Sequence, residues 1–128
     1  MPAAVLVVHN ERDTRDLAVT ALRAAFLEAV GFENPMAALD AVEANSRVRV
    51  LVTRVDFGPG KPNDIALARM IRVKRPGTKV VFVAREEYAA HAEGLGVFLP
   101  MPLTNPDILV ATISRLLVTQ DEDEAAAI

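Results

Sequence analysis

Residues 48–83 read VRVLVTRVDFGPGKPNDIALARMIRVKRPGTKVVFV. The runs at 48–53 and 79–83 are rich in β-branched residues and are as apolar as strands buried on both faces of a sheet. Between them lie a loop of Gly and Pro at 58–62 and a segment with apolar residues at helical spacing, which ends in a Pro-Gly pair. A strand, a crossover helix and a second strand predict a βαβ unit with parallel strands.

The same alternation continues toward the N-terminus. Residues 3–8 form another continuous apolar run and are predicted to be a strand. A helix is expected to begin near Asp13 and to end at Gly31, which suits the position just past a helix end. A brief strand fits at 32–34, and a second helix is predicted at 35–44, where a proline can occupy the first turn.

The C-terminal part of the chain repeats the pattern. A short helix is predicted at 86–93, ended by Gly94, and a strand is predicted at 96–99. Asn105 is expected to cap a terminal helix that begins at Pro106. The chain is therefore predicted to be an α/β protein with a parallel sheet and helices on both faces.

Length and charge indicate one near-neutral domain. The 128 residues carry a net charge of −3, but residues 1–120 hold 14 basic and 13 acidic side chains. We expect residues 1–120 to form the domain and the acidic residues 121–128 to form a disordered tail. The charge favours neither a nucleic acid nor an anionic membrane as partner. The absence of cysteine excludes disulfides, thiolate metal sites and cysteine nucleophiles.

The chain shows no sign of membrane insertion or export. No apolar run approaches the roughly 18 residues needed to span a bilayer. Basic residues are missing ahead of the first apolar stretch, which makes a poor signal peptide. We expect a cytoplasmic protein.

Ligands of doubly wound sheets bind beyond the carboxyl ends of the strands. The residues that follow the predicted strands are therefore the candidates for function. They are His9, Asn10, Arg54, Asp56, Ala84, Arg85, Met101 and Pro102.

Several segments resemble the receiver domain of response regulators. They are "VLVTR" before a Gly/Pro loop, "KVVFVAR" and "FLPMP", set within five βα units over about residues 4–118. The resemblance implies a flavodoxin-like, five-stranded parallel sheet in the order 2-1-3-4-5. It also implies a place in a two-component or phosphorelay pathway.

Receivers hold Mg²⁺ with two acidic residues after the first strand and accept phosphate on an Asp after the third. On this resemblance the acidic pair is replaced by His9 and Asn10, and the phosphoaccepting Asp by Arg54. Mg²⁺ prefers carboxylate oxygens, whereas Arg54 brings a fixed positive charge. We therefore expect no metal and no cofactor. Asp56, two residues further on, is the one nearby carboxylate that could accept phosphate instead, but we favour its interpretation as a loop cap or a partner of Arg54.

The remaining family positions point the same way. Ala84 replaces a hydroxyl residue and Met101 replaces a lysine, while Pro102 and the aromatic Phe98 keep the pattern. Neither a phosphate loop after the first strand, as a flavin enzyme would need, nor a nucleophile elbow is present. The chain is predicted to be a pseudo-receiver without enzymatic activity, a stand-alone module that acts by contact with another protein.

The strand-end residues allow a second interpretation. His9, Arg54 and Arg85 can form a pocket for an anion or a small regulatory molecule. Alternatively, neighbouring acidic side chains neutralise the two arginines in ordinary surface ion pairs, which we favour because no glycine-rich phosphate loop accompanies them.

A contact surface is predicted elsewhere. Tyr88 and His91 share a helix face because they are three residues apart. In receivers the fourth helix, fifth strand and fifth helix meet partners or a second copy, so Tyr88, His91, Leu95 and Phe98 are candidates for an interface and for a homodimer. The alternative is that Phe98 is core and Tyr88 is ordinary cover.

Overall fold

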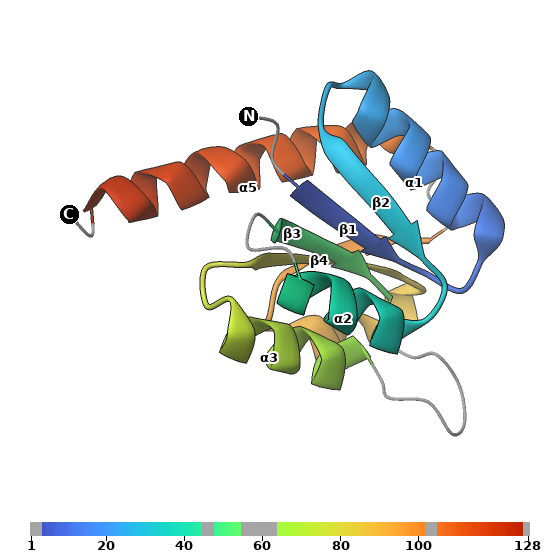
Figure 1. The fold of residues 1–128 in the computed structure, drawn as a ribbon. Helices are drawn as coiled ribbons and strands as arrows, with labels where there is room; N and C mark the ends of the chain where they lie inside the picture. The colour runs from blue at the N-terminus through green and yellow to red at the C-terminus, as the bar shows by residue number, and fades with distance from the viewer. Residues whose placement is uncertain (1–3, 45–47, 55–63, 102–104, 127–128) are drawn as a thin grey trace.

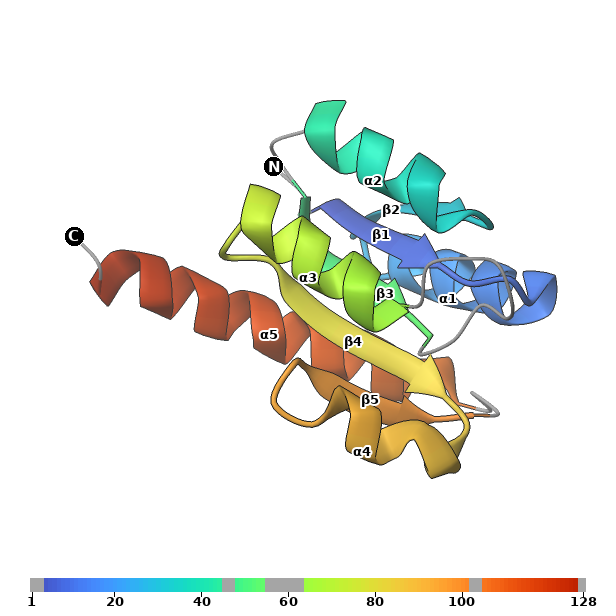
Figure 2. The ribbon, with the colours of Figure 1, turned by 90° about the horizontal axis from the view of Figure 1, so that it is seen from below.

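The computed structural model describes residues 4–44, 48–54, 64–101 and 105–126. Five strands form one parallel sheet in the order β2-β1-β3-β4-β5. Figure 1 labels β1 to β4, and Figure 2 shows β5 beside β4. The strands are β1 (Ala4–Val8), β2 (Glu28–Phe32), β3 (Val48–Thr53), β4 (Lys79–Ala84) and β5 (Val97–Pro100). The predicted flavodoxin-like fold and its strand order are confirmed. The predicted loop at 58–62 lies outside the described residues.

Helices cover both faces of the sheet (Figures 1 and 2). One face carries α1 (Arg12–Ala24) and α5 (Pro106–Ala126). The other carries α2 (Pro35–Ala44), α3 (Asp64–Lys74) and the four-residue α4 (Ala89–Ala92). A single 3₁₀ turn precedes α4, so the predicted helix at 86–93 is shorter and less regular than expected.

Alternating side chains of the strands form two cores, one on each face of the sheet. In β1, Val5 and Val7 pack toward α1 and α5, whereas Leu6 and Val8 pack toward α2 and α3. Because both faces are covered, the strand needs no polar side chain, which is why its sequence is uninterrupted in apolar residues.

The observed end of α1 differs from the helix end that the sequence predicts. The helix ends at Ala24, not at Gly31, and Gly31 lies within β2. Phe26 adopts φ 65°, and the N–H groups of Phe26 and Leu27 donate to the carbonyls of Arg23 and Leu22. These two bonds are the Schellman arrangement that closes a helix, here with Phe where glycine is usual. The brief strand predicted at 32–34 accordingly begins four residues earlier, at Glu28.

Two glycines shape the approach to β5. Gly94 has φ 79° and follows α4, near the helix end that was predicted there. Gly96 lies so close to β4 that an added Cβ would be 2.3 Å from the carbonyl oxygen of Val80. Only a residue without a side chain fits this crossing.

Helix α5 is fixed to the amino ends of the strands by Gln120. This residue is 5% exposed, its Oε1 accepts a 2.5 Å hydrogen bond from Arg49 Nε, and its Nε2 donates to the Gly77 carbonyl. The helix continues to Ala126, past the domain boundary that the sequence predicts at residue 120, and the disordered tail expected from residue 121 stays a prediction. Glu and Ala favour helix, which accounts for the continuation. Within the described residues, no helix is long and apolar enough to cross a membrane.

Candidate functional site

His9, Arg54 and Ala84 lie at the carboxyl ends of neighbouring strands. Val8 pairs with Thr53 at the end of β1 and β3, so His9 and Arg54 follow on adjacent strands. Ala84 is the last residue of β4 and pairs with Pro100 of β5. The register therefore places these residues where parallel α/β proteins bind ligands.

His9 is buried and neutral. It is 2% exposed, and its Nδ1 accepts a 3.1 Å hydrogen bond from the Glu11 N–H. Nδ1 can accept only when it carries no proton, so in the neutral ring the proton is on Nε2. Burial, and then repulsion from Arg54, lower the pKa of His9 from 6.5 to about 4. The ring is therefore uncharged at neutral pH.

The Nε2 of His9 lacks a hydrogen bond of normal geometry to any described residue. An interaction with the Val83 backbone raises the pKa of the ring, but less than burial lowers it. The backbone of His9 is better held. Its N–H donates to the Phe32 carbonyl at 3.0 Å, and its carbonyl accepts a 2.8 Å hydrogen bond from Arg15 Nη1.

Arg54 forms a hydrogen bond to the side-chain oxygen of Asn10, which is the atom that Asn10 could offer to a metal ion. Its Nη1 donates to Asn10 Oδ1 across the ends of β3 and β1. A cation placed between these strand ends would meet a guanidinium that stays protonated and an amide oxygen that already has a donor. The part of the chain that the structure describes holds no cluster of three or more His, Asp or Glu suited to a metal.

Neither Ala84 nor Met101 has a side chain that could donate a hydrogen bond to a phosphoryl group or neutralise its charge. Ala84 is buried, and its carbonyl accepts a 2.8 Å hydrogen bond from the Met101 N–H. The half-buried Met101 side chain packs against the core beneath α5. Pro102 and Asp56 lie outside the described residues, so the proposed roles of both stay predictions.

The described contacts of Arg85 are with Tyr88 and Glu87. Its guanidinium lies 5.6 Å from the centre of the Tyr88 ring, donates to the Tyr88 hydroxyl and forms a 3.1 Å ion pair with Glu87. The hydrogen bond with Tyr88, followed by Glu87, raises the pKa of Arg85. His9 and Arg54 are adjacent, but the described contacts do not bring Arg85 to them. The three-residue pocket stays a prediction.

The residues of the predicted contact surface are mostly half-buried. Tyr88, Leu95 and Phe98 pack against the core on the α2 and α3 face of the sheet. The side chain of His91 lies outside the described residues. These three apolar residues therefore support the fold and leave part of each side chain exposed.

Sequence reasoning missed Arg15. This residue of α1 holds the His9 carbonyl from six positions further along the chain. The helical spacing identified α1, but no pattern in the sequence indicates that one of its arginines turns back to the end of β1.

No family model matches the chain, and no curated protein is detectably similar to it in sequence. Solved structures do match. The chemotaxis protein CheY4 of Vibrio cholerae matches with a TM-score of 0.79 at 20% identity, over 91% of this chain and 99% of that one. A response regulator receiver protein from Sinorhizobium medicae has a TM-score of 0.81 at 18% identity, with 93% and 97% covered. The chain has the fold of a response-regulator receiver domain.

This chain also matches part of a longer protein of known structure. NtrX from Brucella abortus, solved with ADP, matches with a TM-score of 0.88 at 25% identity over 99% of this chain. The match covers 30% of the NtrX chain, so this receiver corresponds to about a third of that protein. The likeness concerns the fold and does not extend to the chemistry of the strand-end residues.

Proposed function

We propose that the chain is a receiver-like signalling module that is not phosphorylated at position 54 and acts by binding another protein. The receiver fold supports a place in a two-component or phosphorelay-related pathway. The side chains at the strand ends support a pseudo-receiver, since position 54 offers no carboxylate and positions 84 and 101 offer neither a hydroxyl nor an amine. On this proposal the chain is not an enzyme.

The contact between Arg54 and Asn10 carries the proposal. A phosphoaccepting carboxylate needs a divalent cation beside it to offset the charge of the incoming phosphoryl group. Here a guanidinium lies at the strand ends and is hydrogen-bonded to Asn10 Oδ1. The positive charge is built into the chain, so the site has no need of a cation and no carboxylate at position 54 to modify.

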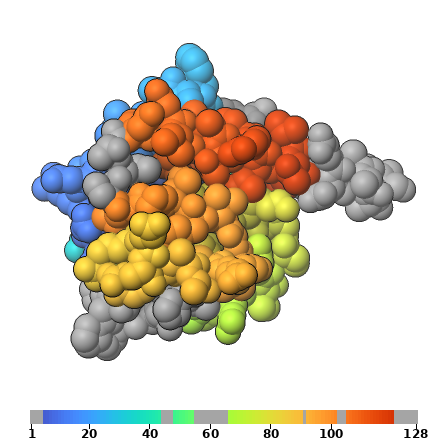
Figure 3. Space-filling model, turned by 180° about the vertical axis from the view of Figure 1, so that it is seen from behind, coloured from blue at the N-terminus to red at the C-terminus, as the bar shows by residue number. Residues whose placement is uncertain are grey.

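The α4–β5–α5 face supports the second half of the proposal. Figure 3 shows the segments of these three elements side by side on one surface. On α5, Ile108 is 52% exposed and Val118 is 57% exposed. Tyr88, just before α4, and Phe98, in β5, are partly exposed. We propose that another protein, or a second copy of this chain, binds this face. Analytical ultracentrifugation over a range of protein concentrations tests whether a second copy of the chain binds. A monomer at every concentration would exclude the homodimer.

Phosphorylation is tested by incubating the protein with a small phosphodonor and Mg²⁺ and measuring its intact mass. We expect no gain of a phosphoryl group. The matched control is Asp56→Asn, since Asp56 is the carboxylate closest in sequence to position 54. A mass gain that disappears in Asp56→Asn would identify Asp56 as the acceptor and overturn the proposal.

A further inference from the structure

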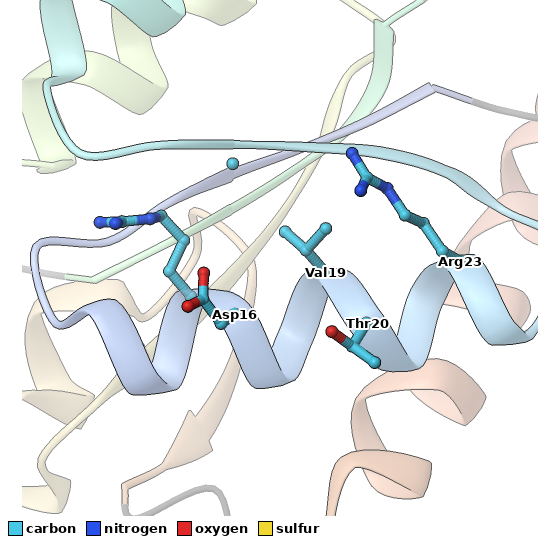
Figure 4. A pocket seen from close by; sticks show the side chains of 6 residues that line it. Asp16, Val19, Thr20 and Arg23 are labelled. Atoms are coloured by element: carbon cyan, nitrogen blue, oxygen red, sulfur yellow. The ribbon is translucent and has the colours of Figure 1, made fainter.

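A groove between α1 and β2 lies away from the strand-end site. It has a volume of about 400 Å³ and is lined by Arg15, Asp16, Val19, Thr20, Arg23 and Gly31. Figure 4 shows Val19 and Arg23 extending from α1 toward the strand that passes over the helix, with Thr20 and Asp16 beside them. The side chains of one helix and the backbone of one strand thus define the groove.

The strand side of the groove offers an open backbone donor. β2 is at the edge of the sheet and pairs only with β1. The Phe32 carbonyl bonds to His9 of β1, so by alternation the N–H and C=O groups of Ala29 and Gly31 point away from β1. Gly31 has no side chain to cover this N–H. An added Cβ there would meet Arg15 at 3.1 Å and Val19 at 3.3 Å.

The helix side of the groove offers a positioned guanidinium. Arg23 Nε donates to the Ala29 carbonyl at 3.0 Å, which fixes the plane of the group at the strand edge. Its two terminal nitrogens make no further hydrogen bond or ion pair to the residues that the structure describes. A guanidinium held by one edge presents its other N–H groups as a fork that matches an oxyanion.

The charges around the groove permit an anion. Asp16 is the one carboxylate among the lining residues, and its exposed side chain pairs with Arg12 at 3.6 Å. The lining contains two arginines against that single acid. The Ala29 carbonyl already accepts from Arg23, so an extended peptide could not pair with this edge without displacing Arg23. A compact ligand fits better than an added strand.

We propose that the groove between α1 and β2 binds a compact oxyanion of the phosphate or phosphomonoester class. The Arg23 guanidinium and the Gly31 N–H hold its oxygens, and Thr20 provides a hydroxyl beside them. The site is noncovalent and separate from position 54, so it does not depend on whether the protein is phosphorylated there.

The test is a titration of ¹⁵N-labelled full-length protein at constant ionic strength, followed by amide chemical shifts. The probes are inorganic phosphate, O-phosphoserine and acetate. We expect saturable shifts at Gly31 and Thr20 with the two phosphates and weaker ones with acetate. Tighter binding of O-phosphoserine would assign the site to a phosphoryl group carried on a larger molecule, and tighter binding of inorganic phosphate would assign it to the free ion.

Two arginine variants make the test specific. Arg23→Gln removes the charged fork and is expected to weaken binding about tenfold, which is a typical loss for a charge-assisted hydrogen bond. Arg69→Gln, an exposed arginine on α3, is the matched control and should bind as the wild type does. Equal unfolding midpoints of the two variants establish that Arg23→Gln is folded.

Three results would overturn the proposal. One is the absence of saturable shifts at Gly31 and Thr20 with either phosphate. Another is equal weakening by Arg23→Gln and Arg69→Gln, which would indicate a diffuse charge effect. The third is a set of shifts centred on His9, Asn10 and Arg54, which would place the anion at the strand ends instead.

Discussion

Burial sets the charge of His9 more firmly than its neighbours do. The ring is 2% exposed, and its pKa is lowered from 6.5 to about 4, first by burial and then by Arg54. A group whose pKa is lower in the folded state binds its proton preferentially in the unfolded chain. The contribution of a neutral His9 to stability is therefore complete above pH 6.5 and is lost as the pH falls from 6.5 toward 4.

This lowered pKa predicts acid sensitivity. We expect the free energy of unfolding to fall by about 2 kcal/mol between roughly pH 7 and pH 5 because of this one residue. His9→Asn keeps an acceptor for the Glu11 N–H but cannot titrate, so its stability should change little over the same interval. Urea unfolding at the two pH values measures both proteins. Parallel losses in wild type and variant would assign the effect to other groups.

At the scale of elements, the junction of α1 and β2 is held by a residue poorly suited to its conformation. Phe26 has φ 65° and is 89% exposed, so its side chain contributes little packing while its backbone is strained. A left-handed conformation costs an L-residue roughly 1–2 kcal/mol relative to glycine. The Schellman hydrogen bonds of Phe26 and Leu27 maintain it nonetheless.

We predict that Phe26→Gly stabilises the protein by about 1 kcal/mol, because glycine adopts positive φ without a clash. Phe26→Ala is the control, since it removes the same exposed ring but keeps the Cβ that causes the strain. Urea unfolding should show a clear gain for glycine and a much smaller change for alanine. Equal effects of the two variants would mean that the ring, and not the backbone, determines the result.

The same junction shows where sequence reasoning fails. Residues 23–30, RAAFLEAV, are mostly good helix formers, so local propensity extends the helix toward Gly31. The tertiary pairing of Ala29 and Val30 with β1 overrides that propensity. The strands β1, β3 and β4 were predictable because burial on both faces leaves an uninterrupted apolar run.

The candidate site was predictable in its location but not in its contacts. Topology alone brings the residues after parallel strands to one edge, so His9, Asn10 and Arg54 could be grouped from sequence. The direction of long side chains could not. Arg15 reaches back to His9, and Arg85 turns to Tyr88, because of neighbours that only the folded chain supplies.

For the whole molecule, Gln120 defines how much of the chain the domain needs. It is buried, and its amide links α5 to the Gly77 and Arg49 carbonyls at the amino ends of the strands. We predict that the chain shortened to end at Gln120 unfolds at the same urea concentration as the full chain. Gln120→Ala in the full chain should cost about 2 kcal/mol, because it leaves these carbonyls without their donor.

Urea unfolding of the two proteins separates the helix extension from its anchor. A large loss on removing residues 121–128, with little effect of Gln120→Ala, would show that the acidic end of α5 stabilises the domain. That result would contradict the domain boundary predicted at residue 120.

The close approach of Gly96 to β4 also determines whether a substitution of this glycine could be rescued by a second substitution elsewhere in the chain. An added Cβ at Gly96 meets the main-chain oxygen of Val80, which every amino acid at position 80 would present. At Gly31 the obstacles are the side chains of Arg15 and Val19, which smaller residues could replace. Descendants of this sequence could therefore exchange Gly31 after compensating changes at positions 15 and 19. No replacement of the side chain at position 80 could make room for a larger residue at position 96 in this way.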